Sequence, residues 1–409
     1  MKECRICRSN YEPFMSLGKM PIANGFLTAE EFKDEYFFEL SIGFCENCKM
    51  VQLMEQPDRN KMFNDHYAFY SSTSKNMGLH FEKFANHIMN NYIRSSNPFI
   101  VEIGSNDGIM LQHFVDRNIR HLGVEPSANV AEVAMKKGIN TICEFFNEEL
   151  AHQIVSEYGQ ADAFLGANVM CHIPYLHSVI NGIDILLKPD GIVMFEDPYM
   201  GEVIENISYD QFYDEHVFLF SVLSISYLFG QHGMEVIDVE PQWTHGGSMR
   251  YVIARKGVRP VSKRVSTYLE KEKSLGLNTP LVYERFKRNC EHSRDVLISL
   301  LKEIKQQGKR VVGYAATSKS TTILNYCGIG QELIEFISDT TPIKQGKFSP
   351  GAHIPVRPYE EFLSNYPEYA LLFAYNHAKE IMAKEQKFME SGGKWIIYVP
   401  EVKVLEAEE

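Results

Sequence analysis

Four of the eight cysteines form two pairs that could bind one metal ion together. Two residues separate Cys4 from Cys7 and Cys45 from Cys48. Two pairs with this spacing can supply four thiolates to a tetrahedral zinc ion. The 37 residues between the pairs exceed the usual ~15–20, but a longer insert still closes because loop-closure entropy rises only logarithmically with length. Since four thiolates leave no open coordination position, we expect a structural zinc; the alternative is two unrelated cysteine pairs.

Histidines in two aromatic-rich segments are candidates for acid–base chemistry. His216 follows Glu215, and a neighbouring carboxylate can orient an imidazole and raise its basicity. His172 follows the end of an expected strand, where ligands of α/β sheets bind. A third aromatic segment contains Tyr67 and Tyr70. Taken alone, each of these residues is more often structural than catalytic, so residue type leaves their roles open.

A glycine-containing turn follows the first expected strand of the central region. Its pattern is Glu102-x-Gly104-x-x-x-Gly108, in which the glycines allow a tight turn and close approach of the backbone to a ligand. Asn106 stands where the dinucleotide fingerprint has its second glycine, so binding of a pyrophosphate-containing cofactor is disfavoured. Glu125 ends the next strand, where an acidic side chain can bind ribose hydroxyls. The pattern leaves two readings open: a smaller nucleoside ligand, or glycines that only turn the chain with Glu125 as a surface charge.

A later segment, Lys-Pro-Asp-Gly at residues 188–191, recurs in class I methyltransferases. We expect a helix to end there and a strand to follow at 192–196. With this resemblance, the nucleoside ligand is interpreted as S-adenosylmethionine. Asp107 and Asn168 are then further expected contacts of the cofactor.

A second candidate ligand site follows the strand expected at 310–314. The residues from 313 to 322 are mostly small or polar and would expose backbone N–H groups at a helix N-terminus, where anions bind. Lys319 adds positive charge, although the P-loop pattern is missing. A diphosphate is the favoured occupant; the alternative is ordinary capping by serine and threonine. Asp339 and Lys344 follow the next strand and could line the same crevice.

The order of the expected elements divides the chain into three regions. Residues 1–70 contain the cysteine pairs and short apolar runs, which indicates a small β-rich zinc-binding domain. In 71–258, strands alternate with helices, the pattern of a doubly wound, Rossmann-like parallel sheet. Residues 259–409 contain charged connector helices and a smaller Rossmann-like α/β domain. A polar turn at 244–250 either folds toward the active site or only reverses the chain.

Length and composition agree with this division. A chain of 409 residues suits two or three domains, and 44% hydrophobic with 23% charged residues is typical of a globular protein. A net charge of −12 disfavours nucleic acid as a partner. No apolar run approaches the ~20 residues that span a bilayer, and the N-terminus does not read as a signal peptide. We therefore expect no membrane partner and a cytoplasmic location; the oligomeric state, monomer or dimer, stays open.

Together these motifs resemble the C-methyltransferases that act on nucleotide-linked 4-keto-deoxysugars, the 3-C-methyltransferase group. The resemblance extends over essentially the whole chain, and its specificity lies in the combination and order of the motifs. The matching segments are the two cysteine pairs, 67–72, 101–108, 123–127, 168–172, 213–216, 245–250 and 313–316. One departure is Asp214, where related proteins often have histidine.

The resemblance implies a zinc-binding domain, an S-adenosylmethionine-dependent methyltransferase domain and a sugar-nucleotide-binding domain. A ketone at carbon 4 acidifies the proton on carbon 3, which His216 would remove with Glu215 orienting it. Tyr213, and His172 or Tyr67, would donate hydrogen bonds to the enolate, which would attack the sulfonium methyl and leave S-adenosylhomocysteine. The expected contacts of the nucleotide-linked keto-sugar are Tyr70, Ser72, His245, Arg250, Tyr314, Thr317, Ser318, Lys319, Asp339 and Lys344.

Two other functions are weighed against this one. An O- or N-methyltransferase acting on a sugar or small metabolite would need a base but no neighbouring ketone. A zinc-containing adaptor would bind nucleotides in its α/β domains without catalysis. The nucleotide, the sugar, the biosynthetic pathway and the stereochemistry at the methylated carbon are left open by the sequence.

Overall fold

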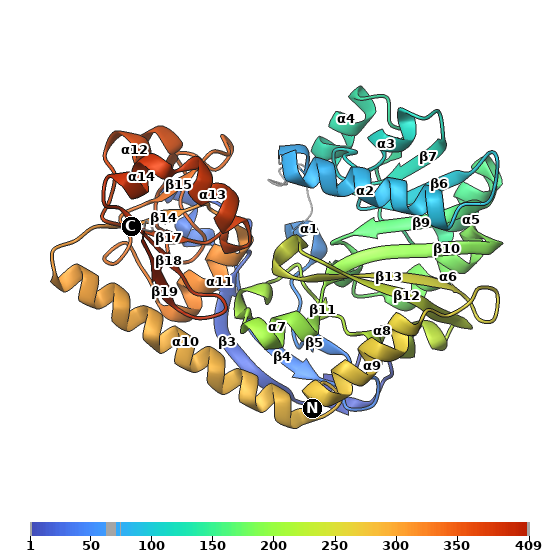
Figure 1. Cartoon of the computed structure of the whole chain (residues 1–409), viewed down its shortest axis with the longest axis horizontal. Helices are drawn as coiled ribbons and strands as arrows, with labels where there is room; N and C mark the ends of the chain where they lie inside the picture. The colour runs from blue at the N-terminus through green and yellow to red at the C-terminus, as the bar shows by residue number, and fades with distance from the viewer. Residues whose placement is uncertain (1, 63–70, 74, 407–409) are drawn as a thin grey trace.

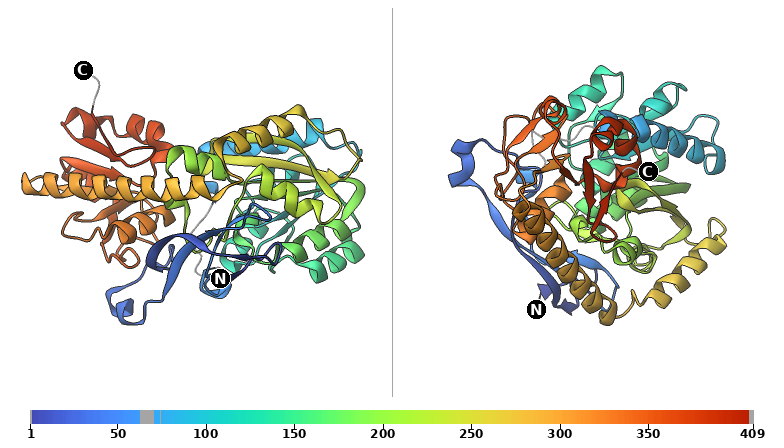
Figure 2. Two further views of the ribbon diagram at one scale, coloured as in Figure 1. Left: turned by 90° about the horizontal axis from the view of Figure 1, so that it is seen from below. Right: turned by 60° about the vertical axis from the view of Figure 1, so that its left-hand side comes forward.

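The computed structural model describes residues 2–62, 71–73 and 75–406. Two α/β units lie beside each other, and N-terminal strands together with a long helix run along the lower side of both (Figure 1). The central unit contains a seven-stranded sheet and the C-terminal unit a six-stranded sheet. The two views of Figure 2 show that the N-terminal strands pass across the molecule from the central unit toward the C-terminal unit.

The N-terminal region is built from short antiparallel strands. A two-stranded ladder, β1–β2, precedes a four-stranded sheet of order β11-β5-β4-β3. The outer strand β11 comes from far along the chain and pairs with β5, so the central region supplies part of this sheet. The strands are β1 (Lys2–Glu3), β2 (Asn10–Tyr11), β3 (Pro13–Pro21), β4 (Phe37–Phe44), β5 (Val51–Leu53) and β11 (Phe218–Leu219).

The central sheet has the order β12-β13-β10-β9-β6-β7-β8. Pairing from β10 through β8 is parallel, while β13 runs antiparallel to both β10 and β12. β6 is buried at all five positions, as expected for a parallel strand covered on both faces. The strands are β6 (Phe99–Ile103), β7 (Arg120–Val124), β8 (Thr141–Ile142), β9 (Ala161–Ala167), β10 (Leu187–Pro198), β12 (Met234–Gln242) and β13 (Ser248–Arg255).

Helices cover both faces of this sheet. One hydrophobic cluster packs α2, α3 and α4 on one face, and another packs α5, α6 and α8 on the other. The Lys-Pro-Asp-Gly segment was expected to end a helix; α6 ends just before it, and the segment lies in β10, where the pairing with β9 is irregular. The helices are α1 (Arg59–Met62), α2 (Lys75–Asn91), α3 (Gln112–Val115), α4 (Ala128–Lys136), α5 (Glu148–Tyr158), α6 (Leu176–Leu186), α7 (Met200–Asn206), α8 (Val222–Gly230) and α9 (Lys263–Leu275).

The C-terminal sheet has the order β16-β15-β14-β17-β18-β19, parallel except for β19. The long helix α10 joins it to the central unit (Figure 1). Its strands are β14 (Val311–Tyr314), β15 (Ile337–Asp339), β16 (Val356–Pro358), β17 (Tyr369–Leu372), β18 (Lys394–Ile397) and β19 (Lys403–Leu405). Its helices, with the connector, are α10 (Pro280–Gln306), α11 (Ser318–Cys327), α12 (Tyr359–Ser364), α13 (Ala378–Lys384) and α14 (Gln386–Glu390).

The hairpin β3–β4 packs on the C-terminal unit. Buried residues of β3 and β4 share one hydrophobic cluster with α10, α11 and the C-terminal sheet. Leu27, in the loop of the hairpin, forms an antiparallel bridge with Phe348. Glu35 of the same loop accepts hydrogen bonds from Gly351 N and His353 Nε2, both at 2.7 Å. The N-terminal region therefore contacts both α/β units. None of the helices in the described residues is long and apolar enough to cross a membrane.

Candidate active site

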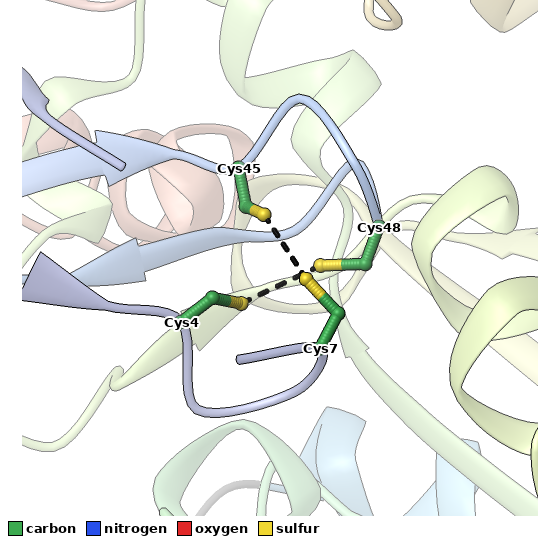
Figure 3. A group of neighbouring side chains, drawn as sticks. All are labelled: Cys4, Cys7, Cys45 and Cys48. Atoms are coloured by element: carbon green, nitrogen blue, oxygen red, sulfur yellow. Dashed lines mark hydrogen bonds between the residues drawn. The ribbon is translucent and has the colours of Figure 1, made fainter. Parts of the chain in front are cut away.

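The four N-terminal cysteines converge on one point (Figure 3). The Sγ atoms of Cys4 and Cys48 are 3.6 Å apart, and those of Cys7 and Cys45 are 3.4 Å apart. Both pairs lie in turns of the same form, in which the residue after the second cysteine donates its backbone N–H to the carbonyl of the first cysteine and has a positive φ. These contacts and the all-thiol donor set fit one tetrahedral zinc ion, as the spacing predicts.

The expected cofactor residues gather at the carboxyl ends of β6, β7 and β9. Gly104, Asn106, Glu125 and Asn168 line one cavity, together with Phe145 and other residues. Glu125 is one of the lining residues, and its two carboxylate oxygens accept the backbone N–H groups of Asn106 and Ser127 at 2.9 and 2.8 Å. Burial raises the pKa of Glu125, although these N–H groups oppose the shift. The cavity offers acidic, amide and aromatic groups to a nucleoside, which fits S-adenosylmethionine.

Gly104 shows why the turn after β6 needs glycine. Its φ is +57°, and a Cβ atom there would lie 2.6 Å from Cγ2 of Val169. Glycine is needed at position 108 for another reason: a Cβ atom added there would lie 1.9 Å from Cδ1 of Ile139. Gly104 thus keeps the cofactor turn close to the β9 loop, while Gly108 lets the chain pack against the loop after α4.

Three further predicted residues lie close to this turn but do not line the cavity. Glu102 is buried, and its pKa is raised well above the usual range by burial and by the charges of Glu125 and Asp107. Asp107 accepts the backbone N–H of Ser72 at 3.2 Å and lies 3.5 Å from the ammonium of Lys137. Ser72, expected to contact the sugar substrate, is therefore placed at the cofactor turn.

His216 is held by hydrogen bonds at both ring nitrogens. Nδ1 lies 2.7 Å from the carbonyl oxygen of Gln211, and because a carbonyl only accepts, Nδ1 carries the proton. Nε2 therefore presents a lone pair, which accepts the hydroxyl of Tyr213 at 2.6 Å. Burial, with the neighbouring His172 ring as a second cause, lowers the pKa of His216 well below its usual range. The imidazole is neutral and can take up a proton at Nε2.

His172 connects this imidazole to the cofactor cavity. Its ring stacks on that of His216 with centroids 5.3 Å apart, and it is also a lining residue of the cavity. Burial lowers the pKa of His172 to about 3, so it too is neutral. The base candidate therefore contacts a histidine ring that also lines the cofactor cavity.

The carboxylates next to His216 in the sequence are held by the N-terminal region. Glu215 Oε1 accepts the side-chain amide of Asn24 at 2.7 Å. Asp214 Oδ1 accepts the backbone N–H of Ala23 at 2.9 Å, and burial together with the charge of Glu215 raises the pKa of Asp214 to about 8. Adjacency suggested that Glu215 orients His216, whereas the orienting hydrogen bond on Nδ1 comes from Gln211.

Lys319 approaches the same centre from the C-terminal unit. It is buried at the start of α11, and its Nζ donates to the carbonyl of His245 at 2.8 Å. Its charge also lowers the pKa of His216 and His245, behind burial in each case. Asp210 stands near this ammonium and accepts the hydroxyls of Tyr375 and Tyr398 at 3.1 and 2.9 Å. The 244–250 turn therefore folds toward the centre, with His245 lining the cofactor cavity.

Arg250, at the end of this turn, lies inside an ion-pair network that includes Glu196, a lining residue of the cofactor cavity. Its guanidinium contacts Glu196 at 2.9 Å and Glu240 at 3.4 Å, and it lies 3.9 Å from the centroid of the Phe84 ring. The arginine is buried. Its charge is thus shared with two carboxylates of the protein.

The remaining C-terminal residues support the turns around α11. Thr317 accepts the backbone N–H of Ser320 at 3.1 Å, which is the capping that the sequence left as an alternative. Asp339 accepts the N–H of Ala316 at 2.6 Å, and Lys344 donates to the carbonyl of Ala316 at 2.8 Å. Ser318 begins α11 beside them.

Tyr314 lies apart from this group. Its hydroxyl donates to Glu385 at 2.7 Å, and its ring packs among aromatic residues of the C-terminal core. Tyr67 and Tyr70 lie outside the described residues.

Several residues at the centre were not singled out from the sequence. Gln211 and Asn24 contact the predicted catalytic segment, and Asp210 faces Lys319. Asp197 is buried at the end of β10, and burial raises the pKa of its carboxyl to about 8. Only Asp197 had a local signal, because it ends an apolar strand next to a proline.

The sheet and the cofactor cavity define an S-adenosylmethionine-dependent methyltransferase, and known families match the chain in the same order. Residues 4–63 match a family described as "Putative zinc binding domain", residues 81–239 one described as "Methyltransferase domain", and residues 243–400 one described as "C-methyltransferase C-terminal domain". The enzyme is thus a methyltransferase that uses S-adenosylmethionine and contains a structural zinc site.

A full-length relative narrows the class. C-methyltransferase NovU of Streptomyces niveus is 34% identical over 409 residues, which cover 99% of this chain and 97% of that protein. The chain belongs to the S-adenosylmethionine-dependent C-methyltransferase family.

Solved structures are similar to less than half of this chain, at low identity. PH0226 protein from Pyrococcus horikoshii OT3 is 12% identical, with 49% of this chain and 100% of that chain covered and a TM-score of 0.37. Magnesium protoporphyrin IX methyltransferase from Synechocystis PCC 6803, with bound S-adenosylmethionine, is 11% identical, with 44% and 79% covered and a TM-score of 0.33.

Proposed function

We propose that this C-methyltransferase adds a methyl group to carbon 3 of a nucleotide-linked 4-keto-deoxysugar. The observation that carries the proposal is the neutral imidazole of His216, with its lone pair at Nε2, one histidine ring away from the cofactor cavity. Methylation at carbon requires loss of a C–H proton, and a ketone at carbon 4 makes the neighbouring proton acidic enough for such a base.

The proposed reaction starts at Nε2 of His216. Substrate entry turns the hydroxyl of Tyr213 away from Nε2, which then takes the proton from carbon 3. The carbonyl of Gln211 stays on Nδ1–H and stabilises the imidazolium. The freed hydroxyl donates to the enolate oxygen; roughly 3–4 kcal/mol is the upper bound for this contact, since that value belongs to donors that need not turn.

Bound S-adenosylmethionine supplies an electrophilic methyl group on a sulfonium. The residues that would hold it are Gly104, Asn106, Glu125 and Asn168, which line the cavity. His172 lies between the cavity and His216 and would bring carbon 3 in line with the methyl group. Positioning of two reactants contributes as much as an acid or base does.

Positive charge on the C-terminal side supports a diphosphate-linked substrate. Lys319 and Lys344 are both buried, and burial lowers the pKa of each ammonium, while nearby carboxylates oppose this shift. Glu215 is one of the carboxylates that act on Lys344, and the charge of Lys319 is one cause of the lowered pKa of His216. In the proposal, Lys319 favours the negative enolate and Lys344 faces the diphosphate. Each ammonium group donates one N–H to a backbone carbonyl. Because an ammonium has three N–H donors, further N–H groups can bind a ligand.

The test is a panel of nucleoside-diphosphate 4-keto-sugars with S-adenosylmethionine, read by NMR of the product. A new methyl on carbon 3 supports the proposal, whereas a methyl on oxygen or nitrogen would contradict it. In D2O, the wild type should also exchange the carbon 3 proton of the accepted sugar. His216→Ala should lose this exchange while binding S-adenosylmethionine normally; unchanged exchange would move the role of the base to another residue.

A further inference from the structure

A second group of metal-ligand side chains lies at the reaction centre, far from the N-terminal cysteines in the sequence. The ligand atoms of Cys171, His172 and His216 all lie within 4.8 Å of one another, and all three residues are buried. In the part of the chain that the structure describes, the other such group is the four-cysteine cluster. One thiol and two imidazoles form a donor set that suits zinc, cobalt, nickel or copper, and not magnesium or calcium.

The hydrogen bonds of His216 are those of a metal-ligating histidine. Such a histidine usually donates its other ring N–H to a carbonyl or carboxylate, which fixes the tautomer. In His216 this partner is the carbonyl of Gln211, 2.7 Å from Nδ1, so Nε2 already carries the lone pair that binds a metal. Tyr213 now donates to Nε2 at 2.6 Å; it would turn away or become a further oxygen ligand.

The thiol of Cys171 is fully buried and lies beside two acidic side chains, Asp197 and Glu215. Burial is the first cause that raises the pKa of this thiol well above its usual range, and the two acidic side chains act in the same direction. A divalent cation would replace the thiol proton, so that no lone buried thiolate has to form. His172 lines the cofactor cavity, which gives a cation a route to the cluster from outside.

We propose that Cys171, His172 and His216 form a second, exchangeable binding site for a divalent d-block cation of the Zn2+ class. On binding, the cation coordinates Nε2 of His216 and the Cys171 sulfur, and the thiol proton passes to solvent. If the proposed function holds, a cation here occupies the lone pair that removes the carbon 3 proton, so it inhibits methyl transfer reversibly. The site would then make the enzyme sensitive to free d-block metal.

The experiment uses Co2+ added to the full-length protein after its N-terminal site has been loaded with Zn2+. Binding at the second site should produce a thiolate-to-cobalt charge-transfer band, with saturation at one equivalent beyond the structural zinc. Cys171→Ala should lose the band and weaken Co2+ binding by at least about tenfold, since loss of even an outer-shell partner costs about 10–100-fold. Cys143→Ala is the matched control, because Cys143 is the exposed cysteine; it should keep the band.

Each outcome decides one part of the proposal. Absence of a band up to millimolar Co2+, or a band that persists in Cys171→Ala, would overturn the site. If Cys171→Ala does not fold, Cys171→Ser can replace it, because serine keeps the shape of the side chain. This variant has no thiol at position 171, so the thiolate-to-cobalt band must be missing here too. These readouts do not depend on any sugar substrate, so they stand even if the proposed function fails. Where an accepted substrate is in hand, inhibition by Zn2+ should be at least about tenfold weaker in Cys171→Ala; equal inhibition would overturn the inhibitory role and leave the metal site standing.

Discussion

Asn24 is predicted to hold Glu215 in the reaction centre, although the two residues are 191 positions apart. Its side-chain amide lies 2.7 Å from Oε1 of Glu215, which is buried. A hydrogen bond to a charged group contributes roughly 1.5–3 kcal/mol. If the whole cost of its loss falls on the transition state, Asn24→Ala should lower kcat by roughly 10- to 160-fold, at ~1.36 kcal/mol per factor of ten.

Steady-state kinetics and the carbon 3 exchange assay would measure this effect. We expect kcat and exchange to fall together while KM for S-adenosylmethionine stays unchanged, because Asn24 is not among the residues that line the cofactor cavity. Asn24→Asp should be at least as damaging as alanine, since it places a second carboxylate against Glu215. A purely structural role of Asn24 would not produce this order.

Asn181→Ala is the matched control. Asn181 is exposed in α6, and its side-chain amide donates to a carboxylate as that of Asn24 does, to Oε2 of Glu148 at 3.1 Å; neither residue lines the cofactor cavity. It should leave kcat and exchange at wild-type values. Wild-type kcat in Asn24→Ala, or equal rates in Asn24→Asp and the wild type, would refute the reasoning.

Three further predictions concern the cofactor turn, a buried acid and the zinc site. Gly104→Ala should weaken S-adenosylmethionine binding about tenfold or more in calorimetry. A left-handed alanine costs roughly 1–2 kcal/mol, and its Cβ would also clash with Val169. Gly138→Ala is the control: this residue also has a positive φ but open space around it, so the variant should bind S-adenosylmethionine normally. The raised pKa of Asp214, about 8, means that its contribution to stability is fully present below the unfolded pKa of ~4 and is lost as pH rises toward 8. The Tm of Asp214→Asn relative to the wild type should therefore rise between about pH 5 and pH 8; parallel curves would contradict the shift. Chelation under denaturing conditions should release one zinc from protein with a vacant second site, and Cys48→Ser should release less and melt earlier; full release from that variant would exclude Cys48 as a ligand.

The local part of the site was predictable from the sequence. Turns at the carboxyl ends of parallel strands collect on one edge of a sheet, so the glycine turn, Glu125 and Asn168 could be placed near one another before the structure was known. The same reasoning brought His172 to this edge. The two cysteine pairs were also predictable, because their spacing alone sets the geometry of the knuckles.

The contacts that orient the predicted groups were not predictable. Sequence adjacency favoured Glu215 as the partner of His216, but neighbours in a chain do not need to face each other, and the carbonyl of Gln211 takes this place. Every residue has a backbone carbonyl, so the residue types do not indicate which carbonyl will accept a hydrogen bond from the imidazole. Likewise, Lys319 follows the pattern of an anion site at a helix start, yet packing buries it against the 244–250 turn.

The long insert between the cysteine pairs is explained by what its loop contacts. The zinc knuckles need no such length, but the β3–β4 hairpin inside the insert extends to the C-terminal unit, where Leu27 pairs with Phe348. On the way, Ala23 bonds Asp214 and also accepts the hydroxyl of Thr321 in α11 at 2.8 Å. One short segment therefore joins the predicted catalytic loop of the central unit to the helix that carries Lys319. The cysteines that would hold the zinc lie at the base of this hairpin, with Cys45 directly after β4, so we expect the metal to support the placement of the hairpin against both units.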